Sequence, residues 1–317
     1  MKISYHRFKN RIKDSVVKYK SQRDQPHSEA YLHIVELLSH LSDQEKDSLQ
    51  AEIRKQLAKS GDTLEYAESV FSAYFQHYVD QTGRFPAIRM MELGPGTNLA
   101  VGLYFLLAGA AQYVAIDALA AFPERPKEFY QQAIAEIKKR PRLIGRSSIE
   151  DPDIDSILQI GETCVWNSER LQYLTPVFAE KIPIEDSAFD YIFSNASFEH
   201  FENPDIVIRE VYRLLKPGGF TVHQIDLRDH IDFEKPLEFL KASKANYEFT
   251  SPYGTNRWRQ SDFGNAFRTA GFQQVRIEVT ESHPISDAEF SSFDPYFAKR
   301  YERKELEIVG IKVYATK

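Results

Sequence analysis

Apolar residues recur at helical spacing in the first part of the chain and at strand spacing further on. Residues 28–82 have a helical pattern throughout, with a capping box formed by Ser42 and Glu45. The last of these helices carries the apolar stripe Leu64, Ala67, Val70, Phe71, Tyr74, Phe75 and Tyr78. Because these helices precede the first strand signal, we expect residues 1–85 to form a basic arm and an N-terminal helical cap outside the sheet.

After Pro86, short apolar strands alternate with helical stretches. The expected strands are Ile88–Leu93, Tyr113–Ile116, Phe189–Phe193, Phe220–Ile225, Val275–Val279 and about Ile308–Tyr314. The expected helices are at about 97–109, 124–140 and 203–215, with an irregular helical stretch between the last two strands. Such alternation is typical of an α/β fold, in which helices cover both faces of a parallel sheet. Residues 141–175 fit this scheme poorly, so we interpret them as an insertion in a domain spanning 86–317.

The composition narrows the class of protein. The 317 residues are 42% hydrophobic and 27% charged, as in a folded globular protein. A net charge of −6 disfavours a protein that coats nucleic acid, so we expect no nucleic-acid partner. Cys164 is the only cysteine, which favours a reducing compartment. With no apolar run long enough to span a bilayer and no apolar core of a secretory signal, we expect a cytoplasmic enzyme.

Residues 1–20 have a composition of their own. Seven basic residues oppose a single acid, Asp14, and an apolar stripe at helical spacing accompanies them. A basic amphipathic helix can lie on an anionic membrane surface, which would make the protein peripheral at the inner membrane face. The alternative is an arm that docks on its own protein or on a sister subunit in a homodimer.

The most informative stretch is a glycine loop between an expected strand and an expected helix. Gly94 permits a tight turn, and Gly96 lets the backbone approach a ligand without a Cβ in the way. Asp117 ends the next strand, 25 residues beyond Glu92, where a carboxylate can accept both hydroxyls of a ribose. Leu99 occupies the place of the third glycine of dinucleotide-binding folds, which disfavours a nicotinamide dehydrogenase. The pattern therefore indicates a nucleoside-type ligand, with a plain strand-to-helix turn as the alternative.

Several ordered motifs resemble those of the class I S-adenosylmethionine-dependent methyltransferases, in particular the type 11-like group. They are Glu92-Leu93-Gly94-Pro95-Gly96, Ile116-Asp117, Ile182–Asp190, Phe198-Glu199-His200, Asn203-Pro204 and Arg213–Gly219. The last of these is the most specific, and in the family it turns from the helix after strand four into strand five. The resemblance runs from about residue 86 to the end of the chain. It implies a Rossmann-like seven-stranded sheet of order 3-2-1-4-5-7-6 with the last strand antiparallel.

The resemblance also implies the cofactor, S-adenosylmethionine, and its contacts. The residues expected to bind it are Glu92, Gly94, Pro95, Gly96, Asn98, Asp117 and Asn195. Asn98 stands where the family often has a small residue, although an amide there could still contact the ligand. The acid that often holds the adenine amino group aligns near Phe178. Either Phe178 stacks on the adenine or Glu180 takes the polar role.

Ionisable residues crowd the expected ends of strands four and five, where open α/β sheets bind ligands. They are Glu199, His200, His223, Asp226, Arg228, Asp229 and His230. Because an oxygen acceptor gains from a general base, His200 is the first candidate and His230 and Asp229 come second, with a structural role for His200 as the alternative. For His223 the structural interpretation is favoured. We expect no obligatory metal, since the spacing of Glu199, Asp226 and Asp229 does not demand one.

Arginine and aromatic residues follow on the same side of the expected sheet. Arg228, Arg257 and Arg259 could hold phosphate or carboxylate groups, while Trp258 and Tyr253 could stack on a sugar or base. Together with residues 226–230, this run resembles, more loosely, methyltransferases of bacterial surface-glycan pathways. It implies a phosphorylated or nucleotide-linked small-molecule acceptor. The alternative is an Arg-Trp cluster that seats its segment on the sheet.

We expect O-methylation of a sugar or a similar polar small molecule, in glycan biosynthesis. One alternative is a methyltransferase that acts on nitrogen or on a protein side chain, which needs no strong base. Another is a non-catalytic methyltransferase-like scaffold at a membrane, attached through residues 1–20.

Overall fold

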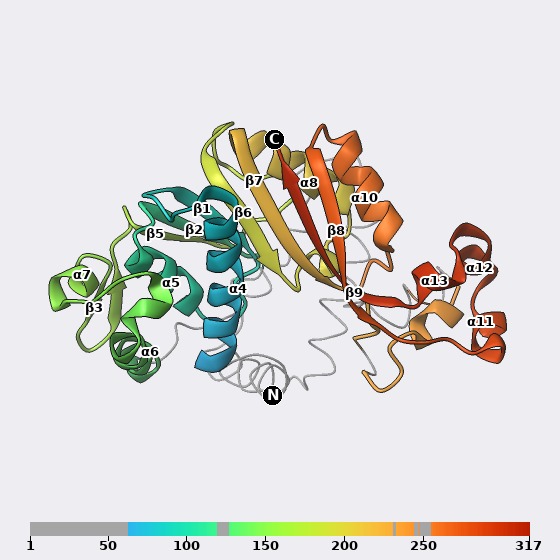
Figure 1. Ribbon diagram of the computed structural model, residues 1–317, viewed down its shortest axis with the longest axis horizontal. Helices are drawn as coiled ribbons and strands as arrows, with labels where there is room; N and C mark the ends of the chain where they lie inside the picture. Colours follow the sequence, from blue (N-terminus) through green and yellow to red (C-terminus); the bar gives the residue numbers. More distant parts are fainter. Residues whose placement is uncertain (1–62, 119–126, 231–232, 244–246, 248–254) are drawn as a thin grey trace, which may run out of the picture. The chain divides into compact units, whose positions relative to one another are not determined.

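The computed structural model describes residues 63–118, 127–230, 233–243, 247 and 255–317 (Figure 1). The chain divides into two compact units, and the one described below comprises Leu64–Ala120 and Glu124–Lys317. The predicted basic arm at residues 1–20 and the capping box lie outside the described residues. So does Tyr253, one of the predicted stacking residues.

A seven-stranded sheet forms the centre of this unit, in the order β5-β2-β1-β6-β7-β9-β8 (Figure 1). Its strands are β1 (Arg89–Leu93), β2 (Gln112–Ile116), β5 (Leu171–Leu174), β6 (Phe189–Asn195), β7 (Leu215–Asp226), β8 (Gln273–Ser282) and β9 (Ile308–Thr316). Counted along the chain within this sheet, the order is 3-2-1-4-5-7-6. Strand β9, the last, is antiparallel to both neighbours, whereas β5, β2, β1, β6 and β7 pair in parallel. The predicted fold class is therefore confirmed.

Helices cover both faces because the central strands bury alternate side chains on either side. The helices of one face are α4 (Leu64–Thr82), α5 (Ala100–Ala108) and α6 (Lys127–Lys139). They enclose a core that includes Met90, Tyr113 and Phe193. The helices of the other face are α8 (Pro204–Leu214) and α10 (Gln260–Thr269). They pack over the alternate strand residues, whose side chains point to this second face, among them Ile116 and Ile192.

Helix α4 is the described part of the predicted helical cap, and it packs directly on the sheet. The rings of Tyr74 and Phe193 have centroids 4.6 Å apart, and those of Tyr78 and Phe220 are 5.1 Å apart. Phe71 packs edge-to-face on Phe105 of α5. Each such buried ring contributes about 2 to 3 kcal/mol by the apolar area it removes from water. The helix is thus fixed over β6 and β7, the strands whose ends carry the predicted acceptor-side residues.

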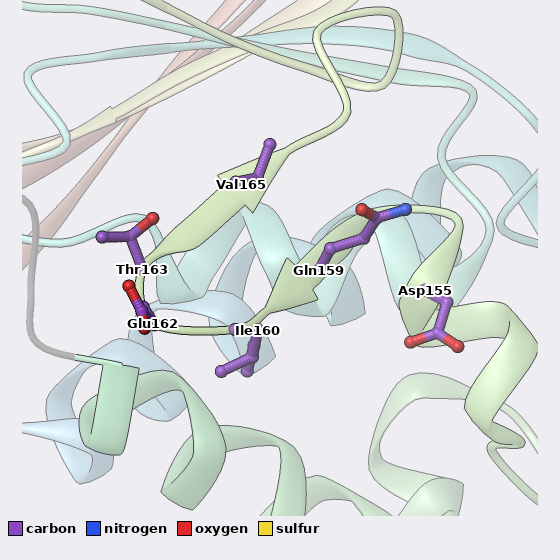
Figure 2. A pocket seen from close by; sticks show the side chains of 7 residues that line it. Asp155, Gln159, Ile160, Glu162, Thr163 and Val165 are labelled. Carbon is purple, nitrogen blue, oxygen red and sulfur yellow. The ribbon is translucent and has the colours of Figure 1, made fainter.

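The segment expected to be an insertion contains a small substructure and one strand of the main sheet. Its elements are η1 (Pro141–Ile144), α7 (Asp151–Asp155) and the antiparallel hairpin of β3 (Leu158–Ile160) and β4 (Cys164–Trp166). Figure 2 shows the hollow beside this hairpin, of about 530 Å³, which none of the predicted site residues lines. Strand β5 pairs with β2. The predicted bounds of 141–175 are therefore too wide, because this four-residue strand has only Leu171 fully buried and gives a weak sequence signal.

The C-terminal region between β8 and β9 forms a satellite core. The irregular helical stretch predicted there consists of α11 (Asp287–Ser292), α12 (Pro295–Arg300) and α13 (Arg303–Leu306). Their apolar residues pack with η3 (Glu238–Lys241) and its flanks. No helix among the described residues is both long and apolar enough to cross a bilayer.

Candidate cofactor and acceptor site

The glycine loop between β1 and α5 has the geometry that its sequence predicts. Gly94 and Gly96 have φ values of +70° and +72°, a region that favours glycine. A Cβ on Gly94 would lie 2.5 Å from Ser197 Oγ, whereas a Cβ on Gly96 would have no other atom within 4 Å. The Gly94 N–H donates a hydrogen bond of 2.9 Å to the carbonyl of Ile116. The loop is thus fixed against the end of β2, while the space beside Gly96 is open to a ligand.

Two carboxylates flank this loop, one buried and one half-buried. Glu92 is 3% exposed and accepts a hydrogen bond from the Tyr113 hydroxyl. Burial raises the pKa of Glu92 to about 7, although the hydrogen bond from Tyr113 lowers it, and the nearby Asp117 carboxylate adds to the rise. Asp117 directly follows β2, and its N–H donates to the Leu174 carbonyl at 3.2 Å. Its position beside the glycine loop is the one predicted from the spacing.

The residues expected around the adenine lie in the loop that follows β5. Phe178 and Glu180 are both half-buried. The Val177 N–H donates a hydrogen bond of 2.8 Å to the Asp117 carbonyl, so this loop is tied to the acid expected to bind the ribose. Burial raises the pKa of Glu180. The hydrogen bond from Val177 places the loop that carries both adenine-side candidates beside the strand end with Asp117.

Asn98 has a local structural task at the start of α5. Its Oδ1 accepts a hydrogen bond of 3.0 Å from the N–H of Ala100, the first residue of the helix. This bond satisfies one of the backbone N–H groups that a helix leaves without an internal partner. Because Oδ1 is used in this bond, the side-chain amide group Nδ2 of Asn98 is the part left to contact a cofactor.

Asn195, at the end of β6, is held by two tyrosines of α4. Its Nδ2 donates to the Tyr66 hydroxyl at 2.6 Å, and the Tyr74 hydroxyl donates to its Oδ1 at 3.2 Å. The residue after it, Ala196, has a φ of +51°, an uncommon conformation for a side chain with a Cβ. The sequence interpretation missed both tyrosines, because a helical stripe of aromatic residues by itself indicates only core packing.

The hydroxyl of Tyr66, which binds Asn195, has a shifted pKa. Burial raises the pKa of its hydroxyl, and the hydrogen bond from Asn195 opposes the rise. The carboxylates of Glu92, Glu199 and Asp226 raise the pKa further.

The acceptor side is built from the short helix η2 (Phe198–His200) and the segment after β7. Glu199 is 1% exposed, and neither carboxylate oxygen makes a hydrogen bond. Burial raises its pKa well above the ordinary range, and the nearby backbone N–H groups of Glu199 and Asp226 offset this only in part. The His200 and His230 rings have centroids 4.8 Å apart. His200 retains accessible surface, but crowding by protein atoms, with a smaller effect from His230, lowers its pKa to about 4.

Arg228 and Asp226 form an ion pair within this side of the site. Arg228 Nε lies 2.9 Å from Asp226 Oδ1, and Nη2 lies 2.6 Å from Oδ2. Burial opposes ionisation of Asp226, but its contacts with His230 and Arg228 outweigh burial and hold its pKa well below the usual range. Asp229 is buried, and its N–H donates to the Pro236 carbonyl at 2.8 Å. In contrast to Asp226, Glu199 has carboxylate oxygens without hydrogen bonds.

Arg257 and Trp258 are used in packing. Arg257 is buried and donates hydrogen bonds to the carbonyls of Phe239 at 3.2 Å and Ala242 at 2.7 Å. The Trp258 ring packs at a tilt on Phe263 of α10, with centroids 5.3 Å apart. These contacts favour the alternative interpretation of this run, namely that it seats its segment on the sheet.

Asn256, in the same run, fixes the turn that carries Glu199. Its Nδ2 donates to the carbonyls of Phe198 at 2.7 Å and Phe201 at 3.0 Å. Its own N–H donates to the Glu199 carbonyl at 2.7 Å, and its Oδ1 accepts from the Trp258 N–H. No sequence signal indicated this role, because the partners lie more than 50 residues apart along the chain.

Two further polar side chains near the site are fully buried with structural partners. His223 Nδ1 lies 2.8 Å from Ser194 Oγ, and its Nε2 lies 2.6 Å from Thr221 Oγ1. Burial lowers the pKa of His223 to about 3, so the ring is neutral near pH 7. Arg259 donates to carbonyl groups just after β7 and at the start of β9. Both residues support strand ends, as the structural interpretation of His223 predicts.

Comparison with known proteins supports the predicted resemblance to methyltransferases. Residues 158–223 match the family model of the methyltransferase domain. The chain is 26% identical over 113 residues to the mitochondrial 2-methoxy-6-polyprenyl-1,4-benzoquinol methylase of Caenorhabditis elegans, covering 32% of this chain and 39% of that protein. It is 24% identical over 137 residues to a demethylmenaquinone methyltransferase of Staphylococcus carnosus, covering 39% of this chain and 56% of that protein.

A solved S-adenosylmethionine-dependent methyltransferase from Mesorhizobium loti aligns with a TM-score of 0.42 at 15% identity, over 74% of this chain and 93% of that one. The match to the methyltransferase domain over residues 158–223 and the order of the seven strands confirm the predicted resemblance to the class I S-adenosylmethionine-dependent methyltransferases. S-adenosylmethionine is the cofactor of that family. The chain spans about half or less of the length of the two curated relatives.

Proposed function

We propose that the protein transfers a methyl group from S-adenosylmethionine to a hydroxyl oxygen of a polar small molecule. The observation that carries this proposal is the glycine loop, which is open beside Gly96 and hydrogen-bonded through Gly94 to the end of β2. Asp117 follows at that strand end. In an open α/β sheet this edge is where nucleoside ligands bind.

The cofactor would be held along the ends of β1, β2, β5 and β6. In this arrangement, the backbone of Gly94, Pro95 and Gly96 approaches the methionine part of the ligand, and Asp117 accepts the ribose hydroxyls. Phe178 and Glu180 are the candidates for the adenine side. At the methionine end the candidates are Glu92, Asn98 and Asn195, of which Glu92 offers a carboxylate to a cationic ligand.

Methyl transfer to oxygen is an in-line displacement at the sulfonium carbon. The acceptor oxygen forms a bond to the methyl carbon while the electron pair of the C–S bond returns to sulfur, so that S-adenosylhomocysteine leaves. The protein has to align the two reactants and to help the hydroxyl lose its proton. His200 is the first candidate for the base, because its lowered pKa leaves a ring nitrogen unprotonated at pH 7. His230 and Asp229 are the second candidates.

The side chains at the acceptor end support a polar acceptor. Glu199, Asp226 and Arg228 place ionisable groups where the acceptor would enter, which suits a hydroxylated molecule such as a sugar. Since Arg228 is paired with Asp226 and Arg257 binds carbonyls, a phosphate or nucleotide part of the acceptor has weaker support. A quinol or quinone ring is the second candidate, because the two curated relatives are named for a benzoquinol and for demethylmenaquinone.

An acceptor screen tests this proposal. The full chain is incubated with S-adenosylmethionine and free sugars, nucleotide-linked sugars or quinols, and the S-adenosylhomocysteine formed is quantified. We expect turnover with a hydroxylated sugar class and a loss of turnover in His200→Ala with unchanged cofactor affinity. Turnover only with quinols, amines or proteins would overturn the proposed acceptor. The cytoplasmic location and the membrane or subunit contact of residues 1–20 stay predictions.

A further inference from the structure

Three side chains with metal-ligating atoms converge on the acceptor side of the site. They are Glu199 and His200, from the turn after β6, and His230, from the segment after β7. Each offers one ligand atom, and these atoms all lie within 4.8 Å of one another. Within the part of the chain that the structure describes, these three side chains form a group that could hold one metal ion.

The Glu199 carboxylate gives an independent indication of a cation. It is 1% exposed, and neither of its oxygens makes a hydrogen bond. A buried carboxylate without hydrogen bonds is unfavourable, and the guanidinium of Arg228 is bonded to Asp226. Because Asn256 holds the turn by its bonds to Phe198 and Phe201, the backbone of Glu199 is fixed in this orientation.

We propose that Glu199, His200 and His230 bind one divalent first-row transition-metal ion. Two imidazoles and one carboxylate are donors that suit Zn²⁺ or Fe²⁺ better than Mg²⁺ or Ca²⁺, which prefer oxygen ligands. With metal–ligand bonds of about 2.1 Å, ligand atoms lie roughly 3.0 to 3.5 Å apart. Small side-chain rotations would bring the ligand atoms of Glu199, His200 and His230 from their present separations into this range. Three protein ligands leave at least one position for an oxygen of another molecule.

Asp226 is placed to orient one of the ligands. Its Oδ2 lies 3.5 Å from Nε2 of His230, from where it can hold the ring when the other nitrogen binds the ion. This ligand set differs from the acids considered in the sequence analysis, because Asp226 is paired with Arg228 and Asp229 is buried near Pro236. The proposal therefore departs from the expectation that no metal is needed.

The chemical role of the ion rests on the proposed methyl transfer to oxygen, and in it His200 is a ligand of the ion instead of the general base. A hydroxyl bound to a divalent ion loses its proton to solvent more readily, and the resulting oxyanion is the better nucleophile. The oxygen then bonds to the methyl carbon, and the C–S electron pair stays on sulfur. In the overall reaction, a hydroxyl and the sulfonium of S-adenosylmethionine are converted into a methyl ether, S-adenosylhomocysteine and a proton.

Metal binding is measured first, without any acceptor. The full chain is freed of metal by chelation, and Zn²⁺ is titrated by calorimetry, with Mg²⁺ as the comparison ion. Co²⁺ is titrated in parallel, because its visible absorption reports the ligand geometry. The variants are Glu199→Gln, His200→Ala and His230→Ala. The matched control is His77→Gln, since His77 packs on Phe220 and Tyr314 away from this strand end.

We expect one Zn²⁺ per chain in the wild type and in His77→Gln, and an affinity lower by at least about tenfold in each of the three site variants. Circular dichroism verifies that the variants are folded, and His200→Ala is the decisive one because its exposed side chain adds little to the core. No Zn²⁺ binding by the wild type, or equal binding by all variants, would overturn the site.

The acceptor screen separates this proposal from the proposed function. Methyl transfer by metal-free protein at an unchanged rate, together with Zn²⁺ binding at the three residues, would overturn the role of the ion and leave both the site and the methyltransferase assignment intact. Zn²⁺ bound at the three residues without transfer to any acceptor would support the site and contradict the proposed function.

Discussion

The side-chain amide of Asn195 donates a hydrogen bond of 2.6 Å to the hydroxyl of Tyr66, a residue 129 positions earlier in the chain. This bond joins α4 to the carboxyl end of β6. Tyr74, two turns further along the same helix, donates to the Ser194 carbonyl at 2.6 Å. A helix that precedes the whole sheet in sequence therefore completes the wall of the candidate site.

Removing the Tyr66 hydroxyl tests whether this contact serves ligand binding. In Tyr66→Phe the ring remains, but Asn195 loses the partner of its Nδ2. We expect the affinity for S-adenosylmethionine to fall about three- to tenfold, as for the loss of one hydrogen bond worth about 1 kcal/mol. Calorimetric titration measures this affinity.

Tyr296→Phe is the matched control, because Tyr296 is an exposed tyrosine of α12 and not a site residue. The free energy of unfolding should change by less than about 0.5 kcal/mol in both variants, as for other surface substitutions. Equal cofactor affinity of Tyr66→Phe and wild type would show that the bond between α4 and β6 has no part in binding.

The buried Glu92 carboxyl makes stability depend on pH. Its pKa in the folded protein is about 7, above the usual value of 4.5. The folded state therefore holds a proton that the unfolded state has lost between these values, and the free energy of unfolding falls as pH rises from about 4.5 to 7. The full shift corresponds to about 3 kcal/mol.

Urea denaturation at pH 5 and pH 8 measures this effect in the wild type and in Glu92→Gln. The variant keeps the size of the side chain but cannot ionise, so the difference in stability between the two pH values should shrink. Glu162→Gln, on the exposed turn of the β3–β4 hairpin, is the control and should behave as the wild type. If the stability of Glu92→Gln depended on pH as steeply as that of the wild type, other ionisable groups would be the cause of the pH dependence.

Asn256 is expected to act as a positioning residue. Asn256→Ala removes both hydrogen bonds to the carbonyls of Phe198 and Phe201, so the turn with Glu199 and His200 is no longer held in position by this side chain. We expect kcat to fall by about 10²-fold, because displacement of catalytic groups by about 1 Å has effects of this size. The affinity for S-adenosylmethionine should stay within about twofold, since the glycine loop is untouched.

The variant Asn256→Asp distinguishes the loss of positioning of this turn from a general loss of protein stability. An aspartate keeps an oxygen for the Trp258 N–H but cannot donate to the two carbonyls. Its kcat should resemble that of Asn256→Ala, although its stability should be lower, because a carboxylate oxygen facing two carbonyl oxygens is unfavourable. Activity that follows stability across both variants would contradict the positioning role.

Local sequence rules predicted the parts of the fold whose causes are local. The glycine loop, the acid at the end of β2 and the strands with long apolar runs all follow from residue type and spacing. Strand β5 was assigned to an insertion because its four residues, Leu171–Leu174, include Gln172 and Tyr173 and give no clear period. Helix α10 was not predicted, because it contains Gly264, a poor helix former, and few of its residues are apolar.

The acceptor side depends on contacts that no local pattern reveals. The bonds of Asn195 to Tyr66 and of Asn256 to Phe198 join segments far apart in sequence. The meeting of Glu199 with His230 likewise requires the ends of β6 and β7 to be neighbours. Sequence spacing alone could name these residues as candidates, but their partners follow only from the order of strands in the sheet.

The most direct test of the central claim is calorimetric titration of the full chain with S-adenosylmethionine and S-adenosylhomocysteine, in the wild type, Asp117→Ala and Asp155→Ala. Asp155 is an exposed acid of α7 remote in sequence from the glycine loop, so its variant controls for the loss of a charge. We predict binding of both ligands by the wild type and Asp155→Ala, and an affinity at least about tenfold lower in Asp117→Ala, as for the loss of hydrogen bonds to a charged group. Absence of binding in the wild type, or equal binding in all three proteins, would contradict the account.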